Sequence, residues 1–447
     1  MRKPGKFRLL VALFLSLSLV AAACGDDDDD EATDTTDDTT DTEETTETDE
    51  TDETTEDASG ESDCEVGEGD GVLKIGTVLP ETGNLAFLGP PEFAAAELAV
   101  QEINEAGGVL GADVELFQGD SGDTSTDIAS QTVDRHLNEG VDAFIGAASS
   151  GVSFTFIDKV TGACKIQFSP ANTSPDFTDY DDNGLYFRTA PSDVLQGRVL
   201  ADLIVADGNE SATVMALQDP YGEGLLQYTL EPLEEQGVAV DEDFVYDPFA
   251  ENFDAEVQRV VDADSDALVL IGFDESARIL TGLFENGFTP DAKSIYLVDG
   301  NVGNALGEQV SAPLSGVKGT LPAAEITDEF RERLLEVDPA LEDFSYGPET
   351  YDAIMITALA ALVAGSDDAV AIAAEINDVT RDGEKCTTFQ ECADLIEAGT
   401  DIDYDGPSGP QTFSDAGEPS EASFAILQYG EDNTIDDELT EYRFAQL

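Results

Sequence analysis

From residue 72 onward, short apolar runs alternate with longer segments in which apolar residues recur every three or four positions. The short runs predict buried strands, and the longer segments predict amphipathic helices. Pro91 lies near the first turn of the first such helix, and Gly107-Gly108 follow its end, as is typical of helix termini. This series predicts strands at 72–80, 113–120, 142–146 and 165–170, with helices at 91–106, 126–140 and 152–160.

A second series of the same kind follows in the chain. It predicts strands at 212–219, 238–246, 266–272 and 294–299, with helices at 224–237, 253–262 and 276–287. Strands that alternate with helices are typical of parallel, doubly wound sheets. We therefore predict an α/β fold with two consecutive Rossmann-like lobes of similar size, and we see no internal repeat of sequence between them.

The first 23 residues have the pattern of a secretory signal peptide rather than of a folded element. Four basic residues at positions 2, 3, 6 and 8 precede an apolar run from Leu9 to Val20 and the small residues Ala21–Ala23. The apolar run is too short for a stable transmembrane helix. Cys24 directly follows the small residues, which resembles the bacterial lipobox and implies that Cys24 is acylated. Ordinary secretion, with Cys24 removed or unpaired, is the alternative.

Residues 24–71 differ sharply from the rest of the chain. After Cys24 they consist mainly of Asp, Glu and Thr, with 24 acidic residues and no Lys or Arg. Such a stretch cannot bury enough apolar surface to offset the entropy of ordering, so we expect a disordered acidic tether. A calcium-binding tail is the alternative, although unstructured acids bind calcium weakly.

Composition narrows the possible functions. With 98 Asp and Glu against 19 Lys and Arg, the net charge is −79, which excludes nucleic-acid binding because phosphate backbones are repelled. One histidine rules out a multi-histidine zinc site. The acidic excess is typical of a solvated surface suited to salty surroundings.

The cysteines favour two disulfides. If Cys24 carries lipid, four cysteines remain, and an even number outside the membrane is typical of paired thiols. Cys386 and Cys392 close a short loop, which leaves Cys64 and Cys164 as the second pair. A metal site would need partner histidines that the chain lacks.

Ligands of open α/β sheets bind at the carboxyl ends of the strands, so the residues that follow each strand are candidates. Ser150 and Gly151 open a predicted helix, whose free N–H groups suit an anion. Asp299 ends a strand and suits a cation. Each residue alone fits a helix cap or a loop, but together they favour a zwitterion such as a free amino acid. The other candidates of this kind are Thr173, Tyr221 and Phe273.

Enzyme-like signals are weak. The segments 179–184 and 401–406 match the first half of a calcium loop, but Ala190 and Thr412 stand where the bidentate glutamate is required. His136 lies in an amphipathic helix, and we expect it at the surface or half buried. A nucleophile elbow, a Walker loop and a dinucleotide fingerprint are not found in the sequence. We therefore expect neither catalysis nor a cofactor or bound metal.

From about Leu73 onward the chain resembles the type I periplasmic solute-binding proteins of ABC importers, in the Leu/Ile/Val-binding (branched-chain amino acid) group and in its bacterial lipoprotein form. The stretches that carry the resemblance are, in order, VLPETGNLAFLGPPEFAAAELAVQEINEAGGVLG, IGAASSGVS, IQFSPANTSP, YFRTAPSDVLQG, PYGEG and LVDG. The resemblance implies two lobes joined by a multi-strand hinge that close on a ligand. It implies a first lobe of residues 72–190 plus about 320–407, and a second of 191–319 plus about 408–447.

The resemblance also implies the roles of individual residues. The ligand carboxylate would lie at Ser150, Ala171 and Thr173, and the α-ammonium at Asp299. Tyr221 and Phe273 would form an aromatic wall. Leu88 stands where the family has an aromatic residue, and Phe273 where it has a tyrosine, so two hydroxyls are missing and the pocket should be more apolar than usual. Asp299 is shorter than the family's glutamate, which could shift ligand selection.

These observations predict an extracytoplasmic solute-binding lipoprotein, anchored to the outer face of the cell membrane by Cys24. We expect it to act as a monomer that delivers an amino acid, branched-chain or otherwise apolar, to an ABC importer permease. Two alternatives remain open at this point. The chain could bind amides or urea-like molecules, or it could be a sensory receptor module that signals through a partner.

Overall fold

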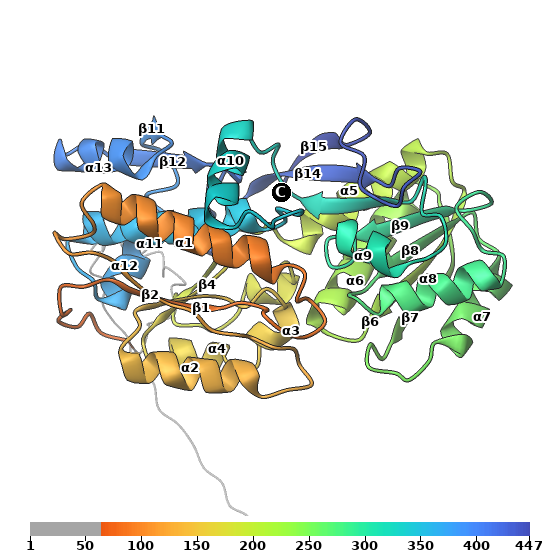
Figure 1. The fold of residues 1–447 in the computed structure, drawn as a ribbon, viewed down its shortest axis with the longest axis horizontal. Coiled ribbons are helices and arrows are strands. Elements are labelled where there is room, and N and C mark those ends of the chain that lie inside the picture. Colours follow the sequence, from red (N-terminus) through yellow and green to blue (C-terminus); the bar gives the residue numbers. More distant parts are fainter. Residues whose placement is uncertain (1–63) are drawn as a thin grey trace, which may run out of the picture. The chain divides into compact units, whose positions relative to one another are not determined.

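The first five strands form a fully parallel sheet in the computed structural model, which describes residues 64–447 (Figure 1). Their order is β2-β1-β3-β4-β5, with Ile75 of β1 opposite Ala143 of β3. This is the parallel sheet that the first series predicted. The strands are β1 (Lys74–Val78), β2 (Glu115–Phe117), β3 (Ala143–Gly146), β4 (Ile166–Ser169) and β5 (Tyr186–Arg188).

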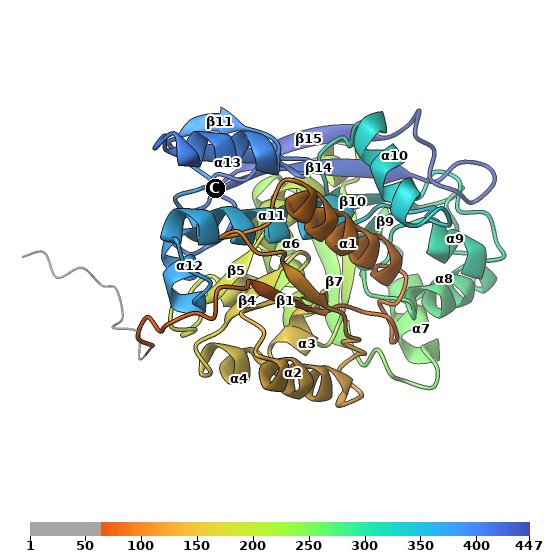
Figure 2. The same cartoon turned by 60° about the vertical axis from the view of Figure 1, so that its left-hand side comes forward.

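Helices cover both faces of this first sheet (Figures 1 and 2). Ala143 and Ile145 of β3 pack into a core with α1 and α11, whereas Phe144 between them packs into a core with α2, because successive side chains of a strand point to opposite faces. The helices on the two faces are α1 (Gly89–Glu105) and α11 (Gly347–Ala364), and α2 (Ile128–Glu139), α3 (Ser150–Ser153) and α4 (Ile157–Thr161).

The second sheet has seven strands in the order β15-β14-β10-β9-β8-β6-β7. Five of these strands, from β10 to β7 in that order, run parallel to one another. At the other edge, β14 pairs antiparallel with β10 and with β15. The parallel strands are β6 (Ser211–Leu217), β7 (Ala239–Tyr246), β8 (Ala267–Ile271), β9 (Ser294–Val298) and β10 (Lys318–Pro322), followed by β14 (Glu421–Gln428) and β15 (Glu441–Gln446).

On the second sheet α5 packs against α6, and α7 packs against α8. Their apolar faces join one core with all five parallel strands. The helices of this part are α5 (Asp193–Ala206), α6 (Pro220–Glu235), α7 (Asp254–Ala263), α8 (Ser276–Glu285) and α9 (Asn304–Gln309).

The chain passes between the two sheets three times, after β5, after β10 and before β14. Between the last two passages the chain returns to α1, against which α10 and α11 pack. We call residues 64–188 and 328–406 the first-sheet region, and residues 193–322 and 421–446 the second-sheet region. The lobe boundaries expected from the resemblance remain a prediction. The elements not yet placed are η1 (Pro175–Phe177), α10 (Asp328–Val337), α12 (Ala369–Ile376), β11 (Glu384–Cys386), α13 (Phe389–Glu397), β12 (Ile402–Gly406) and β13 (Gly409–Pro410).

The cysteines are paired as predicted. Cys64 bonds to Cys164, and Cys386 bonds to Cys392. The predictions for the signal peptide, for Cys24 and for the tether up to residue 63 lie outside the described residues. Within residues 64–447, no single helix is long and apolar enough to cross a membrane, and α11 with α12 would meet that test only as a pair bent by 107°.

Two local predictions were wrong. The helix expected at 152–160 is broken into α3 and α4, because Phe156 leaves the helical conformation and its ring packs with Phe144 in the core. His136 is fully buried rather than at the surface, and its Nε2 lies 3.0 Å from the Thr77 carbonyl oxygen. Burial also lowers the pKa of His136. His136 is therefore part of the interior of the first-sheet region.

Candidate functional site

Loops at the carboxyl ends of strands from both sheets line a small cavity. Its position agrees with the rule that open α/β sheets bind ligands at this edge. Six of the seven residues predicted for a ligand site line it, and Thr173 does not. The lining residues are Leu85, Leu88, Ala148, Ser149, Ser150, Ala171, Tyr221, Phe273, Asp299, Gly300 and Tyr346.

Ser150 reaches the cavity from the loop that follows β3. The preceding Ser149 caps α3, since its hydroxyl accepts a hydrogen bond from the Val152 N–H at 3.3 Å. Ser150 Oγ accepts from the Ser174 N–H at 3.4 Å, which ties this loop to the one after β4. Ser150 therefore opens a single helical turn instead of the longer helix expected from the sequence.

The loop after β4 is held in place by two buried groups. Ser169 Oγ accepts hydrogen bonds from the N–H groups of Ala171 and Asn172. Behind the loop, the Arg188 guanidinium donates to the carbonyl oxygens of Asn172 at 3.2 Å and Ser174 at 2.7 Å. Together they fix the backbone on either side of Thr173.

Arg188 is itself fully buried and paired with Glu418. Its Nε donates to Glu418 Oε2 at 2.8 Å, and Glu418 lies in the segment that enters β14. A buried guanidinium is costly unless its donors are satisfied, and here a carboxylate and two carbonyls satisfy them. The loop of the first sheet is thereby connected to a passage between the sheets.

Asp299 follows β9 and presents a buried carboxylate to the cavity. It accepts hydrogen bonds from Gln196 Nε2 at 2.7 Å, from the Tyr221 hydroxyl at 2.8 Å and from the Tyr346 hydroxyl at 2.8 Å. Burial raises the pKa of Asp299, and the three donors partly offset that rise. The carboxylate is thus aligned from three elements: α5, α6 and the loop before α11.

Aromatic and aliphatic side chains form the walls. The Tyr221 and Phe273 rings are stacked, with centroids 5.6 Å apart and planes 6° from parallel. Leu85 and Leu88 approach from the loop before α1. Tyr346 adds a hydroxyl from the loop before α11, for which the sequence offered no signal. That the pocket is more apolar than usual for the family remains a prediction.

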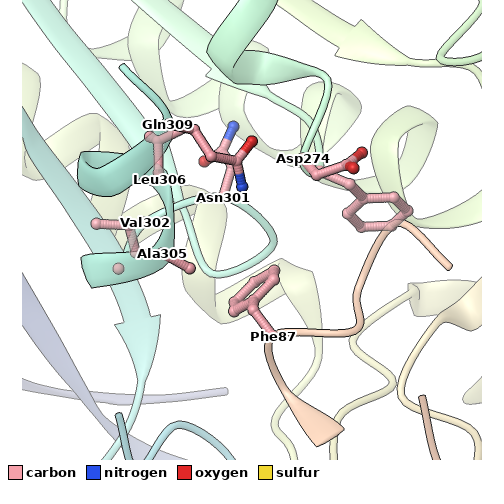
Figure 3. A pocket seen from close by; sticks show the side chains of 9 residues that line it. Phe87, Asp274, Asn301, Val302, Ala305, Leu306 and Gln309 are labelled. Atoms are coloured by element: carbon pink, nitrogen blue, oxygen red, sulfur yellow. The ribbon is translucent and has the colours of Figure 1, made fainter. Parts of the chain in front are cut away.

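A second small cavity adjoins the first and shares Phe273 with it. Figure 3 shows Phe87 pointing into it from the loop before α1, opposite the residues that follow β9. An aromatic side chain therefore does reach this part of the molecule from the first loop, one residue before Leu88. Its walls are largely apolar, with Val302 and Leu306 among them.

Among residues 64–447, no group of three acidic, histidine or cysteine side chains could hold a metal ion. The two half calcium loops have other roles. In one, Asp182 Oδ1 accepts from the Gly184 N–H at 2.7 Å and closes a turn. The other forms β12, where Asp403 and Asp405 pair with Lys385.

Sequence reasoning did not find Asp193, Arg188, Gln196 or Tyr346. The first three lie within the stretch YFRTAPSDVLQG, which served only to recognise a family. A buried charge in that stretch could have been suspected from Arg188, one of only 19 basic residues. Tyr346 has no local signal, because it reaches Asp299 only through the packing of α11.

Comparisons with known proteins agree with this geometry. The family model described as periplasmic binding protein matches residues 72–433. The Leu/Ile/Val-binding protein homolog 1 of Brucella abortus strain 2308 is 27% identical over 306 residues, covering 66% of this chain and 79% of that protein.

A protein of Halobacterium salinarum, named chemotactic signal transduction system substrate-binding protein BasB, is 25% identical over 376 residues, covering 78% of this chain and 84% of its own length. The crystal structure of a leucine-binding protein from Thermotoga maritima superimposes with a TM-score of 0.69 at 22% identity, covering 84% of this chain and 99% of that one.

Proposed function

The chain belongs to the periplasmic binding protein family, a family of extracytoplasmic solute-binding proteins and not of enzymes, and on this premise we propose that it binds a free amino acid. The ligand lies in the cavity between the two sheets. The protein delivers it to an ABC importer permease, and a lipid on Cys24 holds the protein at the outer face of the cell membrane.

The observation that carries this proposal is the opposition of unlike groups across the cavity. On one side, the Ser150 hydroxyl at the start of α3 suits a carboxylate, and the loop that holds Ala171 lies beside it. On the other side stands the Asp299 carboxylate. Of the described residues that line the cavity, none is a lysine or arginine, so an anion would meet only neutral donors. A zwitterion satisfies both sides.

The walls support an apolar side chain on that amino acid. Leu85, Leu88 and the Tyr221–Phe273 stack would contact it. The adjoining cavity behind Phe273 extends this apolar surface through Val302 and Leu306. Burying each methylene there contributes about 0.8 kcal/mol, which favours leucine-like ligands over glycine or alanine.

We expect the two regions to close on the ligand, because each of them contributes residues that line the cavity. Ser150 and Ala171 come from the first sheet, and Tyr221, Phe273 and Asp299 from the second. A ligand favours the closed state only through contacts made better in that state. The permease then recognises the closed form.

Calorimetric titration of the full chain with the standard amino acids tests the proposal. Leucine, isoleucine or valine should bind, and Asp299→Ala should weaken binding at least a hundredfold. Asp266→Ala is the matched control, because Asp266 precedes β8 at the opposite edge of the same sheet. Equal binding by wild type and Asp299→Ala would contradict the role of Asp299.

Two alternatives are carried by specific observations. The similarity to a substrate-binding protein of a chemotactic system favours a sensory role. The resemblance implies a longer glutamate at the position of Asp299, and this difference keeps amides or urea-like molecules open as alternative ligands. Stimulation of a chemoreceptor pathway rather than of permease ATPase would establish the first, and binding of acetamide or urea in place of amino acids would establish the second.

A further inference from the structure

A groove between the two regions lies beside the Asp299 cavity. One wall comes from α10 and the loop before α11 in the first-sheet region, and the other from β10, β14 and β15 in the second-sheet region (Figures 1 and 2). Its volume of about 680 Å³ is typical of a small-molecule site. Tyr346 lines both the groove and the cavity, where its hydroxyl donates to Asp299. The two spaces therefore share one wall.

The floor of the groove is an apolar row that crosses three strands. Leu321 of β10 lies opposite Ala425 of β14, and Ala425 lies opposite Tyr442 of β15. All three line the groove, and so does Leu427, two residues along β14 on the same face. Tyr442 is 44% exposed. A floor of this kind suits a ligand with an apolar body.

The charged side chains around this floor are unbalanced. Six of the lining residues are acids, and Arg331 is the one base among them. The Arg331 guanidinium lies over the Phe344 ring, 4.6 Å from its centroid. An excess of this size repels anions and attracts cations. The acids are Glu325, Asp328, Glu342, Asp343, Glu349 and Asp437.

Glu349 distinguishes the groove from an ordinary acidic surface. It lies in the first turn of α11 and lines the groove, yet it is only 4% exposed. Among residues 64–447, its carboxylate receives a hydrogen bond only from its own backbone N–H. A buried acid of this kind is costly unless a positive partner or a proton neutralises it. It is therefore a buried polar group, at the edge of the groove, that lacks a partner.

A second buried acid lies behind Glu349. Glu92 of α1 is fully buried, and neither of its carboxylate oxygens has a hydrogen-bond partner. The starts of α1 and α11 touch, since a Cβ atom on Gly347 would lie 3.4 Å from the Pro91 carbonyl oxygen. Burial, and after it the charge of Glu349, raise the pKa of Glu92 well above its usual range. Two acids thus meet here without a cation.

We propose that this groove is a second binding site, which takes a primary alkylamine and is coupled to the Asp299 cavity through Tyr346. The ammonium group donates to Glu349, and the alkyl chain covers Leu321 and Ala425. A second copy of this chain, or its acidic segment 25–63, would add negative charge and would not supply the missing cation. An organic cation satisfies both the floor and the buried acid.

The coupling follows from the two regions that such a ligand contacts. An amine held between β10 and the loop before α11 stabilises the arrangement in which both regions line the Asp299 cavity. It should therefore raise the affinity for the amino acid, and by linkage the amino acid should raise the affinity for the amine by the same factor. The coupling rests on the proposed function, whereas the amine site does not.

Calorimetric titration of the full chain with n-hexylamine, n-hexanol and hexanoate tests the site. The three probes share an apolar chain and differ in charge. The wild type should bind hexylamine at least about tenfold more tightly than either of the others, and Glu349→Gln should weaken hexylamine binding by a similar factor, because a charge-assisted hydrogen bond is lost.

Asp352→Asn is the matched control. Asp352 is another fully buried acid one turn along α11, but Tyr404 and Ser408 donate to it and it does not line the groove. This variant should leave hexylamine affinity unchanged. Hexylamine that binds no more tightly than hexanol, or equally well to Glu349→Gln, overturns the inference. The three probes on the wild type decide the matter even if a variant does not fold.

Leucine titrations with and without saturating hexylamine test the coupling. Leucine should bind about fivefold or more tightly when hexylamine is present. Weaker leucine binding would place hexylamine in the Asp299 cavity itself, and unchanged binding would remove the role of Tyr346; either result overturns the inference. If no amino acid binds while hexylamine still binds through Glu349, the proposed function and the coupling fail, and the amine site stands.

Discussion

The two sheet regions present opposite poles of the cavity and build them in different ways. The first-sheet region contributes backbone and a hydroxyl, at Ala171 and Ser150, whose positions depend on remote residues such as Arg188. The second-sheet region contributes a side chain, Asp299, aligned by its own hydrogen bonds. Substitutions within a loop that binds through its backbone leave the binding atoms in place. Such a loop is displaced only by substituting the residues that support it, such as Arg188.

The two regions also differ in their disulfide bonds. Both disulfides lie in the first-sheet region, and the second-sheet region contains no cysteine. Its core of strands and helices has no covalent cross-link. The region that must keep a loop in place is thus the one that is cross-linked. Four experiments test how the two regions differ.

The largest effect should come from removing the longer disulfide. Replacing Cys64 and Cys164 by serine opens a cross-link that spans 100 residues, and the free energy of unfolding should fall by about 4–5 kcal/mol. Removing Cys386–Cys392, which spans 6 residues, should cost about 2 kcal/mol. Denaturant unfolding measures both. Neither pair lines the cavity, so leucine affinity should stay unchanged; a large loss of affinity would mean that the cross-link also shapes the site.

Arg188→Ala should be nearly as damaging to stability and should also affect binding. It leaves Glu418 buried without its partner, which costs about 3–5 kcal/mol, and it frees the carbonyls that hold the loop around Thr173. Urea unfolding and calorimetry measure the two effects. Arg381→Ala, which breaks an exposed pair with Asp415, should cost less than about 1 kcal/mol. Similar losses in both variants would show that the buried pair has no special role.

The substitution Tyr346→Phe tests how the Asp299 carboxylate is aligned. A hydrogen bond to a charged group contributes about 1.5–3 kcal/mol, so loss of the hydroxyl from Asp299 should weaken amino-acid binding roughly ten- to a hundredfold. Tyr429→Phe is the control, because its hydroxyl contacts the Gly303 backbone instead. If both variants bind equally well, the alignment of Asp299 does not depend on Tyr346.

The last prediction concerns the pH dependence of stability. Burial raises the pKa of Glu349, at the start of α11 in the first-sheet region, to about 8. Because the folded protein then holds a proton that the unfolded chain releases above its ordinary pKa, this group should make stability fall as pH rises from about 5 to 8. Glu349→Gln should reduce that slope in unfolding curves across the range. An unchanged slope would show that Glu349 does not titrate there.

Much of the fold could be predicted from local pattern. The apolar runs that became β1, β3, β6 and β8 were recognisable because a strand buried on both faces is apolar throughout. The break between α3 and α4 was not, since Phe156 leaves the helix to fill a space in the core. His136 was misplaced for a similar reason: the contact with Thr77 that buries it spans 59 residues.

The site was predicted in outline for the same physical reason. Residues that follow parallel strands must meet at one edge of a sheet, which brought Ser150, Ala171, Tyr221, Phe273 and Asp299 to one cavity. Thr173 lies one layer behind it. The supporting residues could not be placed, because each one acts through a partner far away in the chain.

The sequence by itself determined the α/β alternation, the pairing of the cysteines and the acidic character of the chain, since each depends on local periodicity, spacing or composition. Only the tertiary structure decided that Tyr346 reaches Asp299 across 47 residues and that Arg188 meets Glu418 across 230. It also decided that Asp193 is buried close to Asp299, behind the loop after β4. These contacts form where segments from different passages between the sheets meet, and no local pattern carries that information.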